Sequence, residues 1–172
     1  MSISPAKITL RSEQAGDETF LREVYGGTRQ EELEAAGFPV AMRGAFLDSQ
    51  FRAQQQGYHS NFPRAEFQII LRLGNPIGRM VINRGAVEWS LVDIALLPAH
   101  RNRGIGTALI QKLSAEAEAA GLPLRLFVIR GQPAFRLYQR LGFVKIGESG
   151  LHDLMEWRSR KSPPKINATH AI

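Results

Sequence analysis

The chain has 172 residues, of which 44% are apolar and 22% are charged. This composition indicates a soluble globular domain and argues against a disordered chain. The absence of cysteine excludes a disulfide framework, a thiolate zinc site, an iron–sulfur cluster and a cysteine nucleophile. The net charge of +6 is uneven: residues 1–86 carry ten basic and nine acidic side chains, and residues 87–172 carry twelve and seven. The excess predicts a local site for a polyanion in the second half of the chain.

The ends of the sequence show no signal for export or membrane insertion. Residues 1–6 lack the basic segment and apolar run of a signal peptide, and no apolar run approaches the roughly 18 residues of a membrane-spanning helix. We therefore expect a cytoplasmic protein with a single domain over residues 1–160. Residues 161–172 include Ser-Pro-Pro-Lys without a helical period, which predicts a flexible tail.

The first half of the chain predicts one strand followed by helices. Lys7–Arg11 has the character of a short strand, and Asp17 is placed to cap a helix that Gly26 and Gly27 would end. Thr28 has a glutamate three residues later, the spacing of a capping box, which predicts a second short helix ending near residue 37.

A third helix and then a series of strands follow. The third helix is expected from about Met42 to Gln56, with Gly57 ending it. Beyond it the pattern predicts a three-stranded meander, a helix, a buried strand, a short helix and two closing strands. The expected ranges are Phe67–Leu73, Ile77–Asn83, Val87–Leu97, Thr107–Ala120, Leu124–Arg130, Pro133–Leu141, Phe143–Gly147 and Leu151–Trp157. The order is mixed α+β with a βαβ unit in the middle.

The turn between the third meander strand and the next helix contains the candidate residues for binding an anionic ligand. Arg101, Arg103, Gly104 and Gly106 lie where that helix begins. Backbone N–H groups point outward at a helix N-terminus, and glycines leave room for a phosphate to approach them. We interpret the turn as a pyrophosphate cradle, although Gly-x-Gly after a strand also forms an ordinary tight turn. The Rossmann pattern requires a glycine where Leu109 stands, and the Walker sequence Gly-Lys-Ser/Thr is absent.

Two blocks of sequence resemble the GNAT acetyltransferase superfamily. Leu96-Leu97-Pro98 followed by Arg101-x-x-Gly104-x-Gly106 is similar to its acetyl-coenzyme-A signature, Gln/Arg-x-x-Gly-x-Gly/Ala. Residues 133–143 resemble its second signature, Asn-x-x-Ala-x-x-Leu-Tyr-x-x-x-Gly-Phe. The resemblance implies a GNAT fold: α+β, with a central, mostly antiparallel twisted sheet, a splayed parallel strand pair, and helices on both faces.

The resemblance also implies how a cofactor would bind. The pantetheine arm of acetyl-CoA would lie between the strands 87–97 and 124–130, and Tyr138 would protonate the departing thiolate as general acid. Taken alone, Tyr138 fits a core residue better than an acid, and the surrounding pattern is what favours the acid role. Gly131 replaces the asparagine of the second signature, so that contact is missing or comes from Gln132. The expected cofactor-binding residues are Ile94, Ala95, Leu96, Leu97, Arg101, Asn102, Arg103, Gly104, Ile105, Gly106, Thr107, Gly131, Ala134 and Tyr138.

An amine acceptor needs a base to remove its proton before it attacks a thioester. Alternation along the third meander strand places residues 88, 90 and 92 on one face and 89, 91 and 93 on the other, unless a bulge changes the phase. Family members with a base on this strand carry it on the face that matches Ser90. Glu88 is therefore the first candidate, and Asp93 is the second because it is near the expected cofactor. Either could be a solvated carboxylate.

In the fold that the resemblance implies, the helices between residues 17 and 56 would cover the acceptor, and the polar or aromatic residues expected to line that site are Tyr25, Arg29, Gln54 and Tyr58. The four histidines lack paired metal-ligand spacing, so we expect no metal.

The expected reaction is direct transfer of an acetyl group from acetyl-CoA to a primary amine in a ternary complex. With no cysteine and no Gly-x-Ser-x-Gly elbow, a covalent acyl-enzyme is not expected. A catalytically weak acyl-CoA-binding or sensor module is the alternative. A nucleic-acid binder is disfavoured because no aromatic residues interleave with the basic run. Small polyamines, amino acids, antibiotic amines and the N-terminus or lysines of proteins stay open as acceptors. No membrane partner is expected, and a homodimer is possible.

Overall fold

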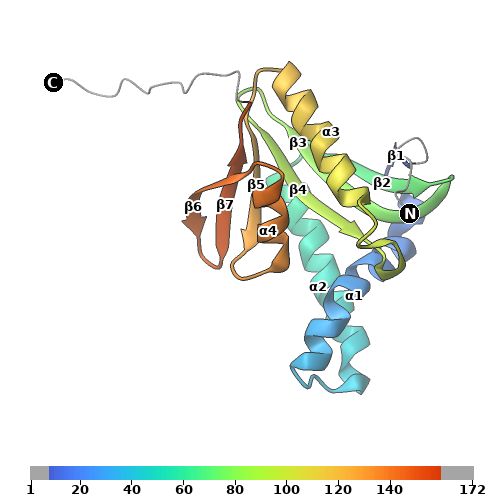
Figure 1. Ribbon diagram of the computed structural model, residues 1–172. Helices are drawn as coiled ribbons and strands as arrows, with labels where there is room; N and C mark the ends of the chain where they lie inside the picture. The colour runs from blue at the N-terminus through green and yellow to red at the C-terminus, as the bar shows by residue number, and fades with distance from the viewer. Residues whose placement is uncertain (1–7, 160–172) are drawn as a thin grey trace.

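The computed structural model describes residues 8–159. Its strands form one seven-stranded mixed sheet (Figure 1). The strand order is β1-β2-β3-β4-β5-β7-β6. Every neighbouring pair is antiparallel except β4 and β5, which are parallel. The strands are β1 (Ile8–Ser12), β2 (Glu66–Arg72), β3 (Asn75–Arg84), β4 (Trp89–Leu96), β5 (Leu124–Ile129), β6 (Val144–Ser149) and β7 (His152–Trp157). The expected α+β fold with one parallel pair is confirmed.

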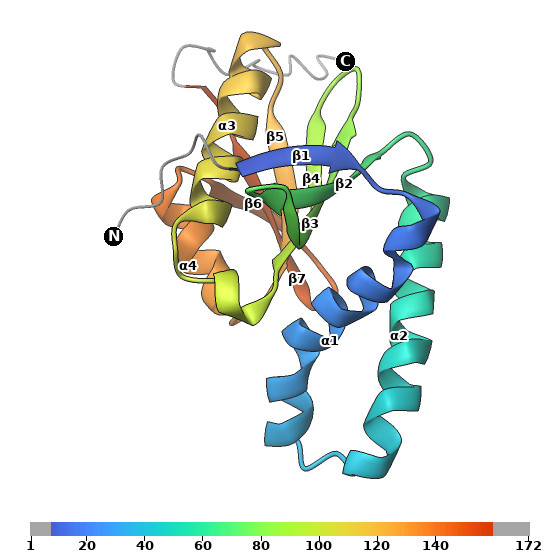
Figure 2. The same ribbon diagram turned by 90° about the vertical axis from the view of Figure 1, so that its right-hand side faces the viewer.

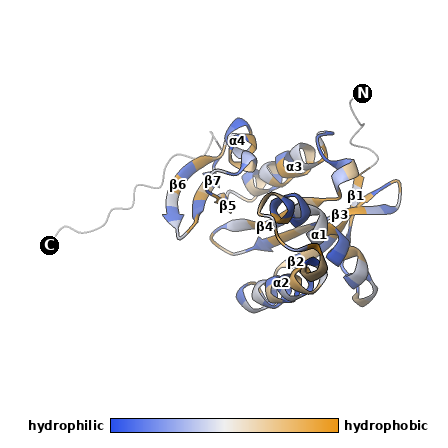
Figure 3. Ribbon diagram, turned by 90° about the horizontal axis from the view of Figure 1, so that it is seen from below, coloured by the Kyte–Doolittle hydropathy of each residue, from blue (hydrophilic) through white to orange (hydrophobic). Residues whose placement is uncertain are grey.

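Helices cover both faces of this sheet. Figure 3 shows α3 and α4 on one face and α1 and α2 on the other. Figure 2 shows that α1 and α2 form a hairpin that extends beyond the strands. The helices are α1 (Glu18–Ala35), α2 (Val40–Asn61), α3 (Ile105–Ala119) and α4 (Pro133–Arg140), with short 3-10 turns η2 (Ala15–Asp17) and η3 (Pro98–His100).

Each face of the sheet has its own apolar core. Under α3, buried residues that include Ile70, Ile82 and Ile110 form the larger cluster. Under α1 and α2, a smaller cluster joins Leu21, Tyr25, Phe51 and Ile69. Adjacent residues of β2 therefore serve opposite cores, as the alternation of a strand requires. Burial of both faces explains why the central strands have long apolar runs.

The predicted break at Gly26 and Gly27 is wrong, because α1 continues through both to Ala35. The Thr28 hydroxyl donates to the Tyr25 carbonyl at 2.7 Å inside this helix, so it does not cap a new one. A Cβ on Gly27 would lie 3.0 Å from Cδ of Pro98. The glycine therefore permits close packing of α1 against η3 and does not end the helix.

The predicted end of the next helix at Gly57 is also wrong, because α2 continues to Asn61. Glycine lowers helix propensity without forbidding a helix. The helix ends before Phe62, which precedes Pro63, and a residue before proline is disfavoured in the helical region.

Three further expectations concern the C-terminal tail, membrane-spanning helices and the edges of the sheet. The predicted tail, residues 161–172, lies outside residues 8–159. Within residues 8–159, none of the helices has both the length and the apolar character that crossing a bilayer requires. The edge strands of the sheet are β1 and β6, and the homodimer expected from exposed edges stays a prediction.

Candidate active site

The parallel strands β4 and β5 pair over three residues and then separate. The paired positions are Trp89 with Leu124, Ser90 with Arg125 and Leu91 with Leu126. Beyond Leu91, β4 stays paired with β3 on its other edge, while β5 stays paired with β7. A gap with unpaired strand edges therefore opens between them. Unpaired edges leave backbone N–H and C=O groups available to an extended ligand.

The glycine turn follows the open end of β4. Gly104 has φ +76°, a left-handed conformation that favours glycine, and it precedes the first residue of α3. No side chain caps this N-terminus by a hydrogen bond. A Cβ built on Gly104 or on Gly106 would meet no atom within 4 Å. The turn thus has open space in front of uncapped backbone amides, which fits a phosphate group.

Arg101 contacts the protein itself in this turn. Its Nε donates to the Leu96 carbonyl at 2.9 Å, and its Nη2 donates to the Gly27 carbonyl at 2.8 Å. The side chain therefore joins the end of β4, the glycine turn and α1. Its expected role as a positive charge beside a pyrophosphate stays a prediction, and its structural role was not foreseen.

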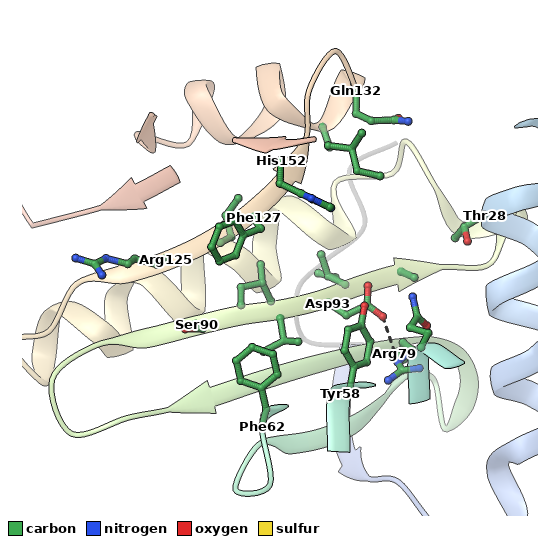
Figure 4. Close-up of a pocket in the computed structure, with 18 of the residues that line it drawn as sticks. Thr28, Tyr58, Phe62, Arg79, Ser90, Asp93, Arg125, Phe127, Gln132 and His152 are labelled. Carbon is green, nitrogen blue, oxygen red and sulfur yellow. Dashed lines mark ion pairs between the residues drawn. The ribbon is translucent and has the colours of Figure 1, made fainter. Parts of the chain in front are cut away.

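A cleft of about 850 Å³ opens on the α1–α2 side of the gap (Figure 4). All four predicted acceptor residues line it: Tyr25, Arg29, Gln54 and Tyr58. Glu88, Asp93, Ile94, Ala95 and Ala134 line it as well. The structure therefore brings the acceptor candidates, both candidate bases and part of the predicted cofactor surface into one cleft. Their functional roles stay predictions.

A bulge in β4 sets which face of the sheet Asp93 occupies. Val81 of β3 pairs with Asp93, whereas the next residue, Ile82, pairs with Leu91, so Val92 is extra. The expectation that residues 91 and 93 share a face is therefore wrong. Leu91 belongs to the core under α3, and Asp93 lies on the opposite face with Arg79.

Asp93 lies deep in the cleft and forms an ion pair with Arg79. Nε of Arg79 is 3.3 Å from Oδ2 of Asp93, as the dashed line in Figure 4 marks. The Arg79 side chain is 3% exposed, and Asp93 retains 20% exposure. Burial raises the pKa of Asp93, and the charge of Arg79 opposes that rise. The Asp93 carboxyl therefore keeps its proton to a higher pH than an ordinary aspartate, and the charge of Arg79 limits that rise.

Glu88, the first candidate base, is held by a different arginine. Its carboxylate pairs with Arg125, whose Nε also lies 2.7 Å from Oε2 of Glu156. Glu156 is buried on β7, so Arg125 connects Glu88 to a fixed acidic partner across the paired end of β4 and β5. Glu88 therefore lies where the strands are still joined, and Asp93 lies beside the gap.

Tyr138 lies on α4 and packs against the larger core cluster. Its ring meets Phe143 edge to face, with centroids 5.7 Å apart. Burial, and secondarily the negative charge of Asp93, raise the pKa of Tyr138 to about 12. The phenol is therefore protonated at neutral pH and is chemically able to donate a proton. Its expected role as general acid stays a prediction.

Gly131, which stands where the family signature has asparagine, adopts a left-handed backbone conformation. Gly131 has φ +84° in the turn between β5 and α4. The neighbouring Gln132 extends to α1, where its Nε2 lies 3.5 Å from Oε1 of Glu32. Gln132, which we considered as a substitute for the missing amide, thus lines the cleft mouth beside α1.

Sequence reasoning missed Arg79 and its partner on α2. Nη1 of Arg79 donates to Oε1 of Gln55 at 3.1 Å, and its guanidinium lies over the Tyr58 ring at 5.4 Å. A single arginine within the apolar run Ile77–Ile82 is the signal that could have identified it. A lone charge in a strand that is buried on both faces needs a specific partner.

The separated parallel pair beside an uncapped helix N-terminus places this chain in the class of GNAT-type folds. The PaiA N-acetyltransferase from Thermoplasma acidophilum, solved in complex with coenzyme A, is 18% identical with a TM-score of 0.66; the match covers 88% of this chain and 99% of that one. A GNAT family acetyltransferase from Elizabethkingia anophelis with acetyl-CoA bound is 17% identical with a TM-score of 0.58, covering 89% and 99%. A spermidine N-acetyltransferase SpeG chimera from Vibrio cholerae and hSSAT is 19% identical with a TM-score of 0.58, covering 88% and 95%. These likenesses establish the fold.

The family model "Acetyltransferase (GNAT) family" matches residues 29–143, more than half of the sequence. The chain therefore belongs to the GNAT family of acetyltransferases, and the predicted family membership is confirmed. No curated protein matches the chain.

Proposed function

We propose that this protein transfers an acetyl group from acetyl-CoA to a primary amine by direct attack in a ternary complex. The observation that carries this proposal is the separation of β4 and β5 beyond Leu91, next to the glycine turn. Unpaired backbone at the gap would bind an extended pantetheine arm, and the amides at the start of α3 would bind a pyrophosphate. Bound acetyl-CoA would supply the acetyl group as a thioester.

The proposed reaction needs two proton transfers, and a different residue performs each one. Asp93 takes the proton from the attacking amine, directly or through water, as the new N–C bond forms. Tyr138 gives its phenolic proton to the sulfur as the C–S bond breaks. We favour Asp93 over Glu88 as base because the bulge at Val92 turns Asp93 into the cleft beside the gap, whereas Glu88 pairs with Arg125. Tyr25, Arg29, Gln54 and Tyr58 form the acceptor wall.

The absence of cysteine makes one experiment particularly direct. A thiol reagent added to the reaction reads only released coenzyme A, because the protein contributes no thiol. We expect saturable binding of acetyl-CoA by calorimetry and thiol release that requires an added amine. Binding without thiol release across a broad amine library would favour the acyl-CoA-binding or sensor alternative. No binding at millimolar acetyl-CoA would refute both.

The same assay tests direct transfer. Mixing protein and acetyl-CoA without an amine should give no burst of thiol, and the mass of the protein should stay unchanged. A stoichiometric burst with a gain of one acetyl group would instead show a covalent intermediate.

A further inference from the structure

The charges that line the acceptor side of the cleft are balanced in pairs. Three carboxylates line it, and each contacts an arginine that also lines it. Glu32 lies 3.1 Å from Arg29, Asp93 lies 3.3 Å from Arg79, and Glu88 pairs with Arg125. Among residues 8–159, the cleft lining therefore offers no carboxylate without an arginine contact.

This balance argues against an acceptor with several positive charges. A polyamine brings at least one ammonium group besides the amine that reacts, and each ammonium needs an anionic partner when it loses water. Asp93 provides one such partner for the reacting amine. A second ammonium group would meet carboxylates that guanidinium groups have already neutralised.

Arg29 and Arg79 both line the cleft that contains Asp93. Arg79 is buried and forms an ion pair with Asp93. It donates from Nη1 to Gln55 and lies over the Tyr58 ring, while its buried Nη2 makes no hydrogen bond within residues 8–159. Arg29 is different, because 37% of its side chain is exposed and its guanidinium lies over the Tyr25 ring. Its charge also acts on the Asp93 carboxyl, whose pKa it helps to lower. Arg29 is thus an accessible cation close to the candidate base.

The partner that Arg29 now holds is easily exchanged. Its ion pair with Glu32 joins adjacent turns of α1 near the surface, where such a pair contributes little stability. Glu32 also has a second contact, with Gln132 of the α4 N-terminus. A ligand carboxylate would form a planar, two-hydrogen-bond pair with Arg29, which a guanidinium favours over a single contact.

We propose that the acceptor is an amino acid, an inference that rests on the proposed function. The ammonium group of the amino acid contacts Asp93, and its carboxylate binds Arg29. The net charge of such a zwitterion is zero, which matches the balanced cleft. Its two opposite charges are complementary to Asp93 and Arg29, which line the same cleft. An amine without a carboxylate would leave the Arg29–Glu32 ion pair intact and would gain no binding energy from Arg29.

The test compares acceptors that differ only in the carboxylate. Phenylalanine is compared with phenethylamine, and lysine with cadaverine, by thiol release at saturating acetyl-CoA; spermidine is the polycationic probe. We expect at least one amino acid to exceed its decarboxylated partner in kcat/KM by tenfold or more. Decarboxylated amines or spermidine that serve as well as the amino acids would refute the inference while leaving the proposed function intact. Failure of every acceptor would overturn both.

Substitution of Arg29 checks the assignment of the carboxylate contact. Arg29→Gln should reduce the preference for the carboxylated acceptor by tenfold or more, and Arg29→Lys should restore part of it. The control is Arg52→Gln, an exposed arginine of α2 that faces a separate cavity of about 510 Å³ and should keep the preference. Thermal melting establishes that each variant is folded. An equal loss for both members of an acceptor pair would refute a role for Arg29 in carboxylate binding.

Discussion

The guanidinium of Arg79 and the carboxylate of Asp93 form an ion pair between adjacent strands, with Nε 3.3 Å from Oδ2. Arg79 is almost fully buried, so a change at either residue leaves the other charge without its partner. The pair therefore links the protonation of the candidate base to the packing of β3 and α2. Gln55 of α2 completes the link by accepting a hydrogen bond from Nη1 of Arg79.

Asp93→Asn should reduce kcat by about 10² to 10⁴-fold, the range that a general base contributes. The amide retains the shape of the carboxylate but cannot accept a proton. We expect the Kd for acetyl-CoA to change little, as measured by calorimetry. Glu88→Gln is the matched comparison, and a larger loss of kcat in that variant than in Asp93→Asn would restore Glu88 as the base.

Arg79→Met should move the acidic limb of the kcat/KM profile to higher pH. Burial raises the pKa of Asp93 and Arg79 lowers it, so removing the guanidinium raises the pKa further. Because the base acts when deprotonated, the rate then rises with pH over a later interval. A lower rate with an unchanged limb would show that Arg79 does not control this carboxyl.

The same substitution predicts a change in stability with pH. A folded carboxyl with a raised pKa binds its proton over an interval in which the unfolded chain, near its usual value of about 3.9, has already lost it. The free energy of unfolding of Arg79→Met should therefore fall as the pH rises through that interval. Melting temperatures of the variant and the parent protein across the pH range measure this, and parallel curves would contradict it.

Tyr138→Phe should lower kcat on the order of a hundredfold while the affinity for acetyl-CoA stays within a few-fold. Phenylalanine preserves the edge-to-face contact with Phe143, so the fold is retained. Because the pKa of Tyr138 is about 12, its titration should produce no fall in rate below pH 10. An unaltered kcat would remove Tyr138 as the proton donor.

The sequence predicts the strands closely because a half-buried or fully buried strand shows its period locally. The sequence predicts α3 and α4 closely but not the bounds of α1 and α2. The role of Gly27 in α1 depends on Pro98, which is distant in the sequence and whose Cδ lies 3.0 Å from where a Cβ of residue 27 would stand. The face of the sheet on which Asp93 lies could not be predicted for a related reason. Val92 is the extra residue of a bulge, and that bulge is defined only by the pairing of β4 with β3. The family resemblance identified the cleft residues on α1 and α2, whereas the Arg79–Asp93 pair required the register of the sheet.

Gly106→Ala separates cofactor binding from folding. A Cβ at this helical position meets no protein atom within 4 Å, so alanine should keep or raise stability, by up to about 1 kcal/mol. It would, however, occupy the space in front of the amides proposed to bind the pyrophosphate. We expect the Kd for acetyl-CoA to rise by about tenfold or more, an estimate based on losing one charge-assisted hydrogen bond.

Gly57→Ala is the control for that substitution. Gly57 also lies inside a helix with open space around its Cβ position, but on α2. It should give a similar change in melting temperature and the parent affinity for acetyl-CoA. Equal affinities in both variants would contradict a phosphate site at the start of α3.

Arg101→Met and Arg103→Met should differ although both remove a positive charge from the same turn. Arg101 donates to the carbonyls of Leu96 and Gly27, so its loss should lower stability by about 2 kcal/mol and weaken acetyl-CoA binding through displacement of the turn. Arg103 is exposed, so its replacement should leave the melting temperature unchanged.

Salt dependence distinguishes the two effects on binding. If Arg103 acts through its charge on a phosphate, the affinity lost in Arg103→Met should be greatest at low ionic strength and should shrink as salt screens the parent protein. The loss in Arg101→Met should persist at high salt, because it comes from a displaced backbone. Calorimetric titrations with acetyl-CoA at two salt concentrations measure both, and the reverse pattern would assign the phosphate contact to Arg101.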